Sequence, residues 1–260
     1  MTFETLLYEV DGEIGILTLN RPKKVNAFNR KMVDELIEFW RDRQEDSVVR
    51  VIVMRGAGEK GFCSGVDLKD WKNLGPNPEE KEFSPYTLHN AQMRFSSICR
   101  LMRQCPQPII AAIHGPAMGG GLSFTLAADV RLASEDAMFC AQYVNIGLGG
   151  ADMGSSYFLW RIVGSGRAAE ICLTGSRVYA DEAYRIGLVN HIYPRDELMP
   201  AALDMAKNMV SKSKLGLRLT KEALNAGLNL SSLEDANVIE DRNQAYMIAV
   251  GLMNTEIKRS

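Results

Sequence analysis

Apolar stretches of two kinds alternate along the first two thirds of the chain. Ile14–Pro22, Val49–Gly58 and Gln107–Gly121 each hold a short, nearly continuous apolar run that ends at proline or glycine, which is typical of buried strands. Between the first two runs, Asn29–Asp46 carries apolar residues at the spacing of one helical stripe. Because strands and helices alternate, we predict an α/β fold.

The pattern changes near residue 195. From Arg195 to Asn254 the sequence has helical periodicity almost throughout and no strand signal. We therefore expect a core over residues 1–195 and a helical C-terminal region over residues 196–260.

Composition and charge narrow the class of protein. The 260 residues are 46% hydrophobic and 24% charged, and 30 basic residues nearly balance 32 acidic ones. This balance gives no indication of a nucleic-acid or membrane partner, and no apolar run is long enough to span a bilayer. The N-terminal stretch "MTFETLLYEVDGEIG" carries acids and lacks the pattern of a signal or transit peptide, so we expect a cytoplasmic protein.

Cysteine and histidine spacing predicts neither a disulfide framework nor a metal site. The five cysteines include no C-x-x-C pair, and the three histidines are far apart in the sequence. We expect free thiols and no bound metal.

Two segments share a glycine-turn design, Gly61–Trp71 ("GFCSGVDLKDW") and Gly115–Val130 ("GPAMGGGLSFTLAADV"). In each, glycines follow an apolar run and precede a helix-compatible stretch, where free main-chain N–H groups are expected. Two such turns side by side would aim two N–H groups at one oxygen, which is an oxyanion hole. Tight packing of the chain explains the same glycines, so the pattern alone leaves both interpretations open.

The sequence resembles the crotonase superfamily, which includes the enoyl-CoA hydratases and isomerases. The resemblance runs through several segments in order along nearly the whole chain. They are Leu17–Asn29 ("LTLNRPKKVNAFN"), Gly61–Leu68 ("GFCSGVDL"), Pro108–Ser134, Arg161–Gly175 and Asp181–Pro194.

This resemblance implies a spiral of ββα units, a helical C-terminal region used for trimer assembly, and an acyl-CoA thioester as substrate. It implies no permanently bound cofactor, since coenzyme A is part of the substrate, and it implies a homotrimer or a dimer of trimers. The main-chain N–H groups of Val66 and Gly120 would stabilise an enolate-like intermediate. The implied coenzyme A segment comprises Lys24, Val25, Ala27, Ser64, Val66, Asp67, Leu68 and Gly120.

The chain departs from the hydratase pattern at two positions. Hydratases of the family use two glutamates, and the matching positions here hold Ser123 and Tyr143. A serine hydroxyl is a poor base without assistance, and a phenol has a pKa of about 10, so neither replaces a carboxylate directly. Both side chains remain candidates for orienting a substrate or a water molecule.

Asp152 is the remaining candidate carboxylate, in the segment Gly147–Tyr157 ("GLGGADMGSSY"). On the local sequence alone, an aspartate in a glycine-rich turn before a helix is explained equally well as the N-cap of that helix or as a catalytic group. Dienoyl-CoA isomerases of the family have a catalytic aspartate in a similar context, which favours Asp152 as an acid/base. Aryl-CoA dehalogenases of the family have a nucleophilic aspartate before a similar segment. They also use a histidine, and His89 lies several residues upstream of the position where that histidine would be expected in this chain.

The leading hypothesis is therefore an enoyl-CoA hydratase- or isomerase-like enzyme with Asp152 as acid/base. One alternative is hydrolysis or dehalogenation of a cyclic or aromatic acyl-CoA, with Asp152 as nucleophile. Another is a non-catalytic acyl-CoA-binding protein, because both hydratase glutamates are replaced.

Overall fold

The core of the protein is a six-stranded sheet in the order β1-β2-β3-β4-β6-β9. The computed structural model describes residues 3–70 and 84–257. Strands β1 and β2 form an antiparallel hairpin, and the remaining neighbours pair in parallel. The predicted strands at the start of the chain, after residue 49 and after residue 107 are confirmed. The strands are β1 (Leu6–Asp11), β2 (Ile14–Leu19), β3 (Val51–Gly56), β4 (Ile109–Ile113), β6 (Val130–Ser134) and β9 (His191–Tyr193).

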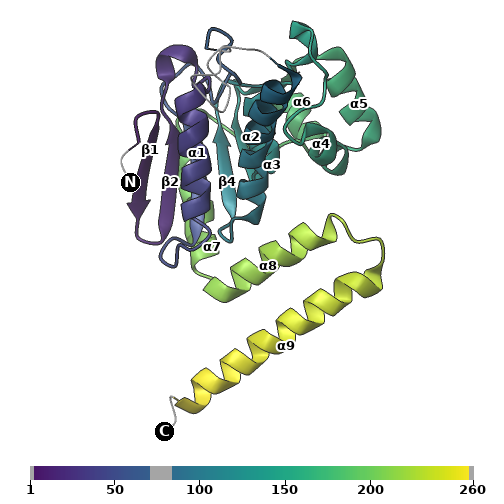
Figure 1. Cartoon of the computed structure of the whole chain (residues 1–260). Helices are drawn as coiled ribbons and strands as arrows, with labels where there is room; N and C mark the ends of the chain where they lie inside the picture. The colour runs from purple at the N-terminus through teal and green to yellow at the C-terminus, as the bar shows by residue number, and fades with distance from the viewer. Residues whose placement is uncertain (1–2, 71–83, 258–260) are drawn as a thin grey trace.

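Helices cover both faces of this sheet, as Figure 1 shows. Successive side chains of a strand point to opposite faces. In β3, Ile52 and Met54 pack into the core beneath α1, α2 and α3, whereas Val51 and Val53 pack against α7. These helices are α1 (Arg30–Asp42), α2 (Pro85–Gln104), α3 (Gly120–Ala127) and α7 (Leu198–Val210).

A small second sheet and a group of short helices stand beside the carboxyl ends of the parallel strands. The sheet has the order β5-β7-β8. It is formed by β5 (Pro116–Met118), β7 (Met138–Cys140) and β8 (Val178–Tyr179), and the helices are η1 (Pro22–Lys24), η3 (Val144–Ile146), α4 (Ser155–Val163), α5 (Ser165–Thr174) and α6 (Ala180–Arg185).

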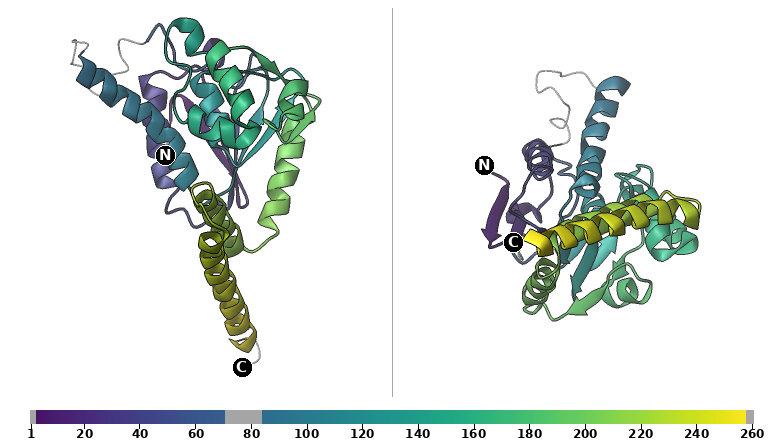
Figure 2. Two further views of the ribbon diagram at one scale, coloured as in Figure 1. Left: turned by 90° about the vertical axis from the view of Figure 1, so that its right-hand side faces the viewer. Right: turned by 90° about the horizontal axis from the view of Figure 1, so that it is seen from below.

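The predicted helical C-terminal region is present, and its parts differ in position. Helix α7 lies on the sheet as part of the core, whereas α8 (Lys214–Gly227) and α9 (Leu233–Ile257) extend away from it (Figures 1 and 2). Helix α8 is fixed to the body by Lys221, whose ammonium lies 2.8 Å from the Asp129 carboxylate and donates to the Gln107 carbonyl at 2.8 Å. Within the described ranges, none of the helices combines the length and apolarity needed to cross a membrane.

Candidate active site

The two predicted glycine turns lie side by side. The Cys63 N–H donates to the Pro116 carbonyl at 3.0 Å, and the Met118 N–H donates to the Cys63 carbonyl at 2.9 Å. A Cβ on Gly65 would lie 3.3 Å from the main-chain nitrogen of Gly120 and 2.8 Å from the Met118 carbonyl oxygen. The turns therefore approach each other main chain to main chain, with no space for a side chain at residue 65.

The Val66 N–H takes no part in the pairing of its own turn with Phe28. Residues 65–67 pair with Phe28: the Phe28 N–H donates to the Gly65 carbonyl, and the Asp67 N–H donates to the Phe28 carbonyl. In this parallel bridge Val66 directs its own N–H away from Phe28. Gly120 is the first residue of α3, where a main-chain N–H has no acceptor within its own helix.

The candidate coenzyme A residues come together from two segments. The Ser64 N–H donates to the Val25 carbonyl at 2.9 Å, and the Ser64 hydroxyl donates to the Lys24 carbonyl at 3.3 Å. Lys24 and Leu68 are exposed at the edges of this pair of segments, and Ala27 is buried. Asp67 is also buried and accepts from Arg21 at 2.9 Å, so its carboxylate holds the neighbouring segment in place.

The buried side chain of Asn26 binds several main-chain groups, a role that the sequence did not predict. Its fully buried amide donates to the carbonyls of Ala57, Gly61 and Phe62 and accepts from the Arg21 N–H. Its φ of 53° is left-handed, a region that asparagine tolerates better than most residues. Asn26 thus joins the coenzyme A segment to the first glycine turn.

Replacing Asn26 by alanine should destabilise the protein by about 3 kcal/mol, because several buried main-chain groups lose their partner and alanine disfavours the left-handed region. Urea unfolding of Asn26→Ala measures this loss. Asn208→Ala, on the exposed side of α7, is the matched control. Equal unfolding free energies for the two variants would contradict the assigned role.

Asp152 does not cap helix α4. The helix begins at Ser155 after Gly154, with no side-chain cap. The Asp152 Oδ1 instead accepts from the Met153 N–H at 2.6 Å and from the side-chain amide of Gln92 on α2. The local sequence is consistent with an N-cap at Asp152. The structure excludes that role, because the carboxylate faces α2 rather than the first turn of α4.

The environment of Asp152 disfavours its charge. Burial raises the pKa of the Asp152 carboxyl above its ordinary value, and the hydrogen bonds from Met153 and Gln92 only partly oppose this rise. The Oδ2 atom has no hydrogen-bond partner among the described residues. Asp152 therefore combines a raised proton affinity with one free oxygen.

Ser123 and Tyr143 are buried beneath the turn that carries Asp152. Ser123 has no exposed surface and Tyr143 is 5% exposed. Their hydroxyl oxygens lie 2.7 Å apart, and the Ser123 hydroxyl donates to the main-chain carbonyl of Asp152 at 3.1 Å. Burial raises the pKa of Tyr143 well above its ordinary value, so it remains a neutral phenol. The pair holds the main chain at residue 152 in place.

Comparison with known proteins identifies the family. The family model described as enoyl-CoA hydratase/isomerase matches residues 9–256. The chain belongs to the enoyl-CoA hydratase/isomerase family.

Relatives of this family cover most of the chain. A probable enoyl-CoA hydratase of Mycobacterium bovis is 40% identical over 235 residues, which are 90% of this chain and 81% of that protein. The mitochondrial Delta(3,5)-Delta(2,4)-dienoyl-CoA isomerase of Pongo abelii is 33% identical over 241 residues, 91% of this chain and 73% of that protein. A crystal structure of a probable enoyl-CoA hydratase/isomerase from Mycobacterium abscessus has a TM-score of 0.86 at 37% identity and covers 94% of this chain and 90% of its own. The predicted crotonase-type fold is thereby confirmed.

In this member of the enoyl-CoA hydratase/isomerase family, the neighbour of Asp152 on α2 is Gln92 rather than a histidine. His89 lies almost one turn earlier on the same helix and is exposed. The sequence analysis missed Gln92, since an amide in the middle of an amphipathic helix has no distinguishing local pattern.

Replacing Gln92 by methionine should raise the pKa of Asp152 further. The Gln92 amide donates to the carboxylate and so favours its ionised form, and methionine, of similar length, cannot donate. An NMR titration of the Asp152 carboxyl carbon measures the shift. Gln104→Met, at an exposed position of the same helix, should leave that pKa unchanged. An unchanged or lowered pKa in Gln92→Met would contradict the predicted effect.

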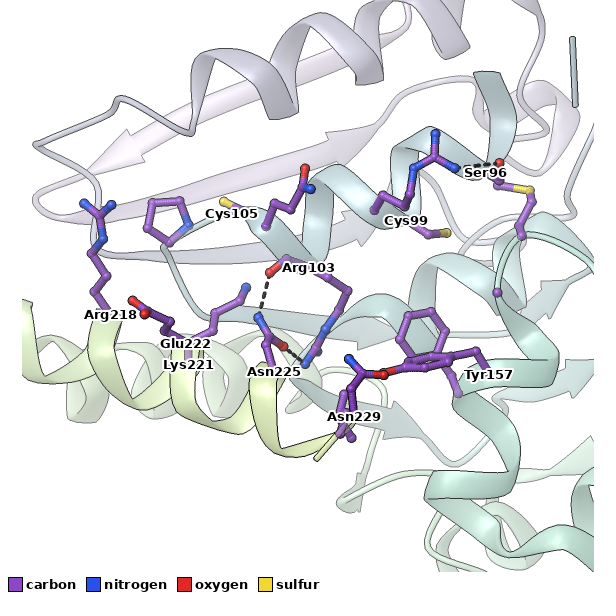
Figure 3. Close-up of a pocket in the computed structure, with 17 residues that line it drawn as sticks. Ser96, Cys99, Arg103, Cys105, Tyr157, Arg218, Lys221, Glu222, Asn225 and Asn229 are labelled. Carbon is purple, nitrogen blue, oxygen red and sulfur yellow. Dashed lines mark hydrogen bonds between the residues drawn. The ribbon is translucent and has the colours of Figure 1, made fainter. Parts of the chain in front are cut away.

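A cavity of about 580 Å³ lies next to this site, between α2, α4 and α8. Figure 3 shows polar side chains of α2 and α8 turned toward one another across it. The Arg103 guanidinium and the Lys221 ammonium both contact Asp129, at 3.0 and 2.8 Å. The Tyr157 hydroxyl donates to the Asn229 side chain at 2.9 Å. The apolar part of the wall includes Cys99, Met153, Phe158 and Leu228.

Proposed function

We propose that this protein isomerises a carbon–carbon double bond of an acyl-CoA thioester through an enolate. The observation that carries the proposal is the pair of adjacent glycine turns, with the main chain of Asp152 hydrogen-bonded to Ser123 on the helix that follows the second turn. The N–H groups of Val66 and Gly120 would bind the thioester oxygen. Such donors are fixed before reaction and stabilise negative charge as it develops on that oxygen.

In the proposed reaction Asp152 moves one proton. Its free Oδ2 removes a proton from the α- or γ-carbon, and the C–H electrons shift toward the thioester oxygen to form the enolate. The protonated carboxyl then returns the proton to the other end of the allylic system, so no atom is gained or lost. The raised pKa of Asp152 favours this role, because a base nearer neutral pH holds the transferred proton better.

The replaced glutamates favour isomerisation over hydration. In hydratases of the family the two glutamates hold and activate the water, and here those positions carry the buried pair Ser123 and Tyr143. A proton shift between two carbons requires one acid/base group and no ordered water. The dienoyl-CoA isomerase of Pongo abelii, 33% identical, performs a reaction of this type by its name.

A nucleophilic Asp152 receives less support. Hydrolysis of a covalent adduct needs a base that activates water, and the side chain that contacts Asp152 from α2 is the amide of Gln92. An amide has no basic site at neutral pH, so it cannot serve as that base.

The segments around residues 24–27 and 64–68 would bind the coenzyme A part of the substrate. Lys24 is exposed at the mouth of this region and would offer its ammonium to a phosphate. Val25, Ala27, Ser64 and Leu68 would line the path, and Asp67 would hold it open through Arg21.

Asp152→Asn should lower kcat for isomerisation of a 3-enoyl-CoA by about 10³-fold, a typical contribution of general acid–base catalysis, while the affinity for saturated acyl-CoA stays unchanged. Turnover is followed by the absorbance of the conjugated product, and affinity by calorimetry. Asp204→Asn, at a solvent-exposed carboxylate, is the control and should retain full activity. A fully active Asp152→Asn would refute the proposed mechanism, and 3-hydroxyacyl-CoA as the product would indicate hydration instead.

The exposed face of α9 supports the proposed assembly into a homotrimer or a dimer of trimers. Val238, Tyr246 and Ile248 are 69%, 56% and 62% exposed on this helix. The opposite side contacts α8, where the Asn243 amide donates to the Leu219 carbonyl. We propose that other copies of the chain cover the exposed face.

Ile248→Asp should dissociate the assembly, because a carboxylate within an apolar interface costs desolvation energy. Light scattering after size-exclusion chromatography should give the monomer mass for this variant and a multiple of it for the wild type. Glu240→Gln, an exposed change on the same helix, should leave the mass unchanged. A monomeric wild type would contradict the proposed assembly.

A further inference from the structure

Met153 lies between the second glycine turn and the cavity between α2, α4 and α8, beside the ring of Phe28. Met153 is 3% exposed, and its sulfur would lie 3.0 Å from a Cβ placed on Gly120. The same residue lines the cavity. One side of Met153 therefore lies close to the second glycine turn, and another side faces the cavity.

Met153 is held in an unfavourable backbone conformation. Its φ is 48°, in the left-handed region that residues with a side chain seldom adopt. Such strain persists where the surrounding structure over-determines it, and it concentrates at sites of function. Here the hydrogen bond from the Met153 N–H to Asp152 and the burial of the Met153 side chain hold the conformation.

The apolar part of the cavity suits an uncharged tail. The cavity volume of about 580 Å³ is within the range of small-molecule pockets. Asp129 pairs with both Arg103 and Lys221, and Tyr157 is paired with Asn229. Arg100, Arg218 and Glu222 add charge to the rest of the lining, whereas Cys99, Met153 and Phe158 form an apolar part of it.

We propose that Met153 is a gate that limits the length of the acyl group, and that the cavity behind it accepts a hydrocarbon tail when the gate is removed. This inference rests on the proposed function, which places the thioester carbonyl at the turns beside Met153. In the wild type a short or compact acyl group ends against the methionine. A longer straight chain meets a closed wall, although the cavity lies beyond it.

Met153→Gly tests the gate and also relieves the backbone strain, since glycine adopts a left-handed φ without cost. Calorimetry with butyryl-, octanoyl- and dodecanoyl-CoA measures affinity without turnover. Each buried methylene adds about fourfold in affinity. The preference for octanoyl- over butyryl-CoA should therefore rise by ~10-fold or more in Met153→Gly relative to the wild type. Met153→Ala, a second truncation, should shift the preference in the same direction.

Two further variants locate the effect. Met153→Leu keeps a large side chain at the gate and should keep the wild-type preference. Leu228 directly follows α8, and Leu228→Trp fills the cavity from there, so it should be neutral alone and should abolish the gain in the double variant Met153→Gly/Leu228→Trp. A gain that survives in the double variant would overturn the assignment of the cavity.

The outcomes separate this proposal from the proposed function. If butyryl-CoA binds the wild type but truncation of Met153 leaves the chain-length preference unchanged, the gate is wrong and the function stands. If no CoA ester binds either protein, both are wrong. Thermal unfolding of each variant shows that the comparison is made on folded protein.

Discussion

The site depends on direct main-chain contact between two chain reversals. Residues 61–66 and 115–121 approach so closely that a Cβ on Gly121 would lie 2.1 Å from the Cys63 carbonyl oxygen. No side chain fits between them, so packing of main chain against main chain sets the separation of the two N–H groups proposed to bind the thioester. Asn26 holds the first reversal from a third segment by binding the carbonyls of Ala57, Gly61 and Phe62.

A second constraint acts on the proton affinity of the Asp152 carboxylate. Asp152 keeps one oxygen in two hydrogen bonds and the other without a partner among residues 3–70 and 84–257, in surroundings that raise its pKa. More hydrogen bonds would fix the carboxylate more firmly but would lower its proton affinity. The buried Ser123–Tyr143 pair avoids this conflict, since it holds the Asp152 main chain and leaves the carboxylate untouched.

The sequence predicted the features that depend on local patterns. The buried strands, the α1 stripe and the two glycine turns follow from periodicity and from the conformational freedom of glycine, and the structure confirms them. Contacts set by tertiary packing could not be predicted. Gln92 reaches Asp152 across 60 positions, and nothing in the α2 sequence distinguishes it from a surface amide. Helix α7 was expected as a helix, but periodicity does not reveal that it lies on the sheet. The N-cap interpretation of Asp152 failed because the side chain facing it comes from another helix.

The buried ion pair of Lys221 with Asp129 has a consequence for how this enzyme can diverge. It fixes α8 over the cavity, while the glycine turns and Asp152 belong to the core and to the turn before α4. Substitutions on the cavity side of α8 can therefore reshape the space beyond Met153 without moving any group proposed to handle the proton. Under the two proposals, changes on α8 would alter the far end of the acyl site while Asp152, on the turn before α4, stays in place.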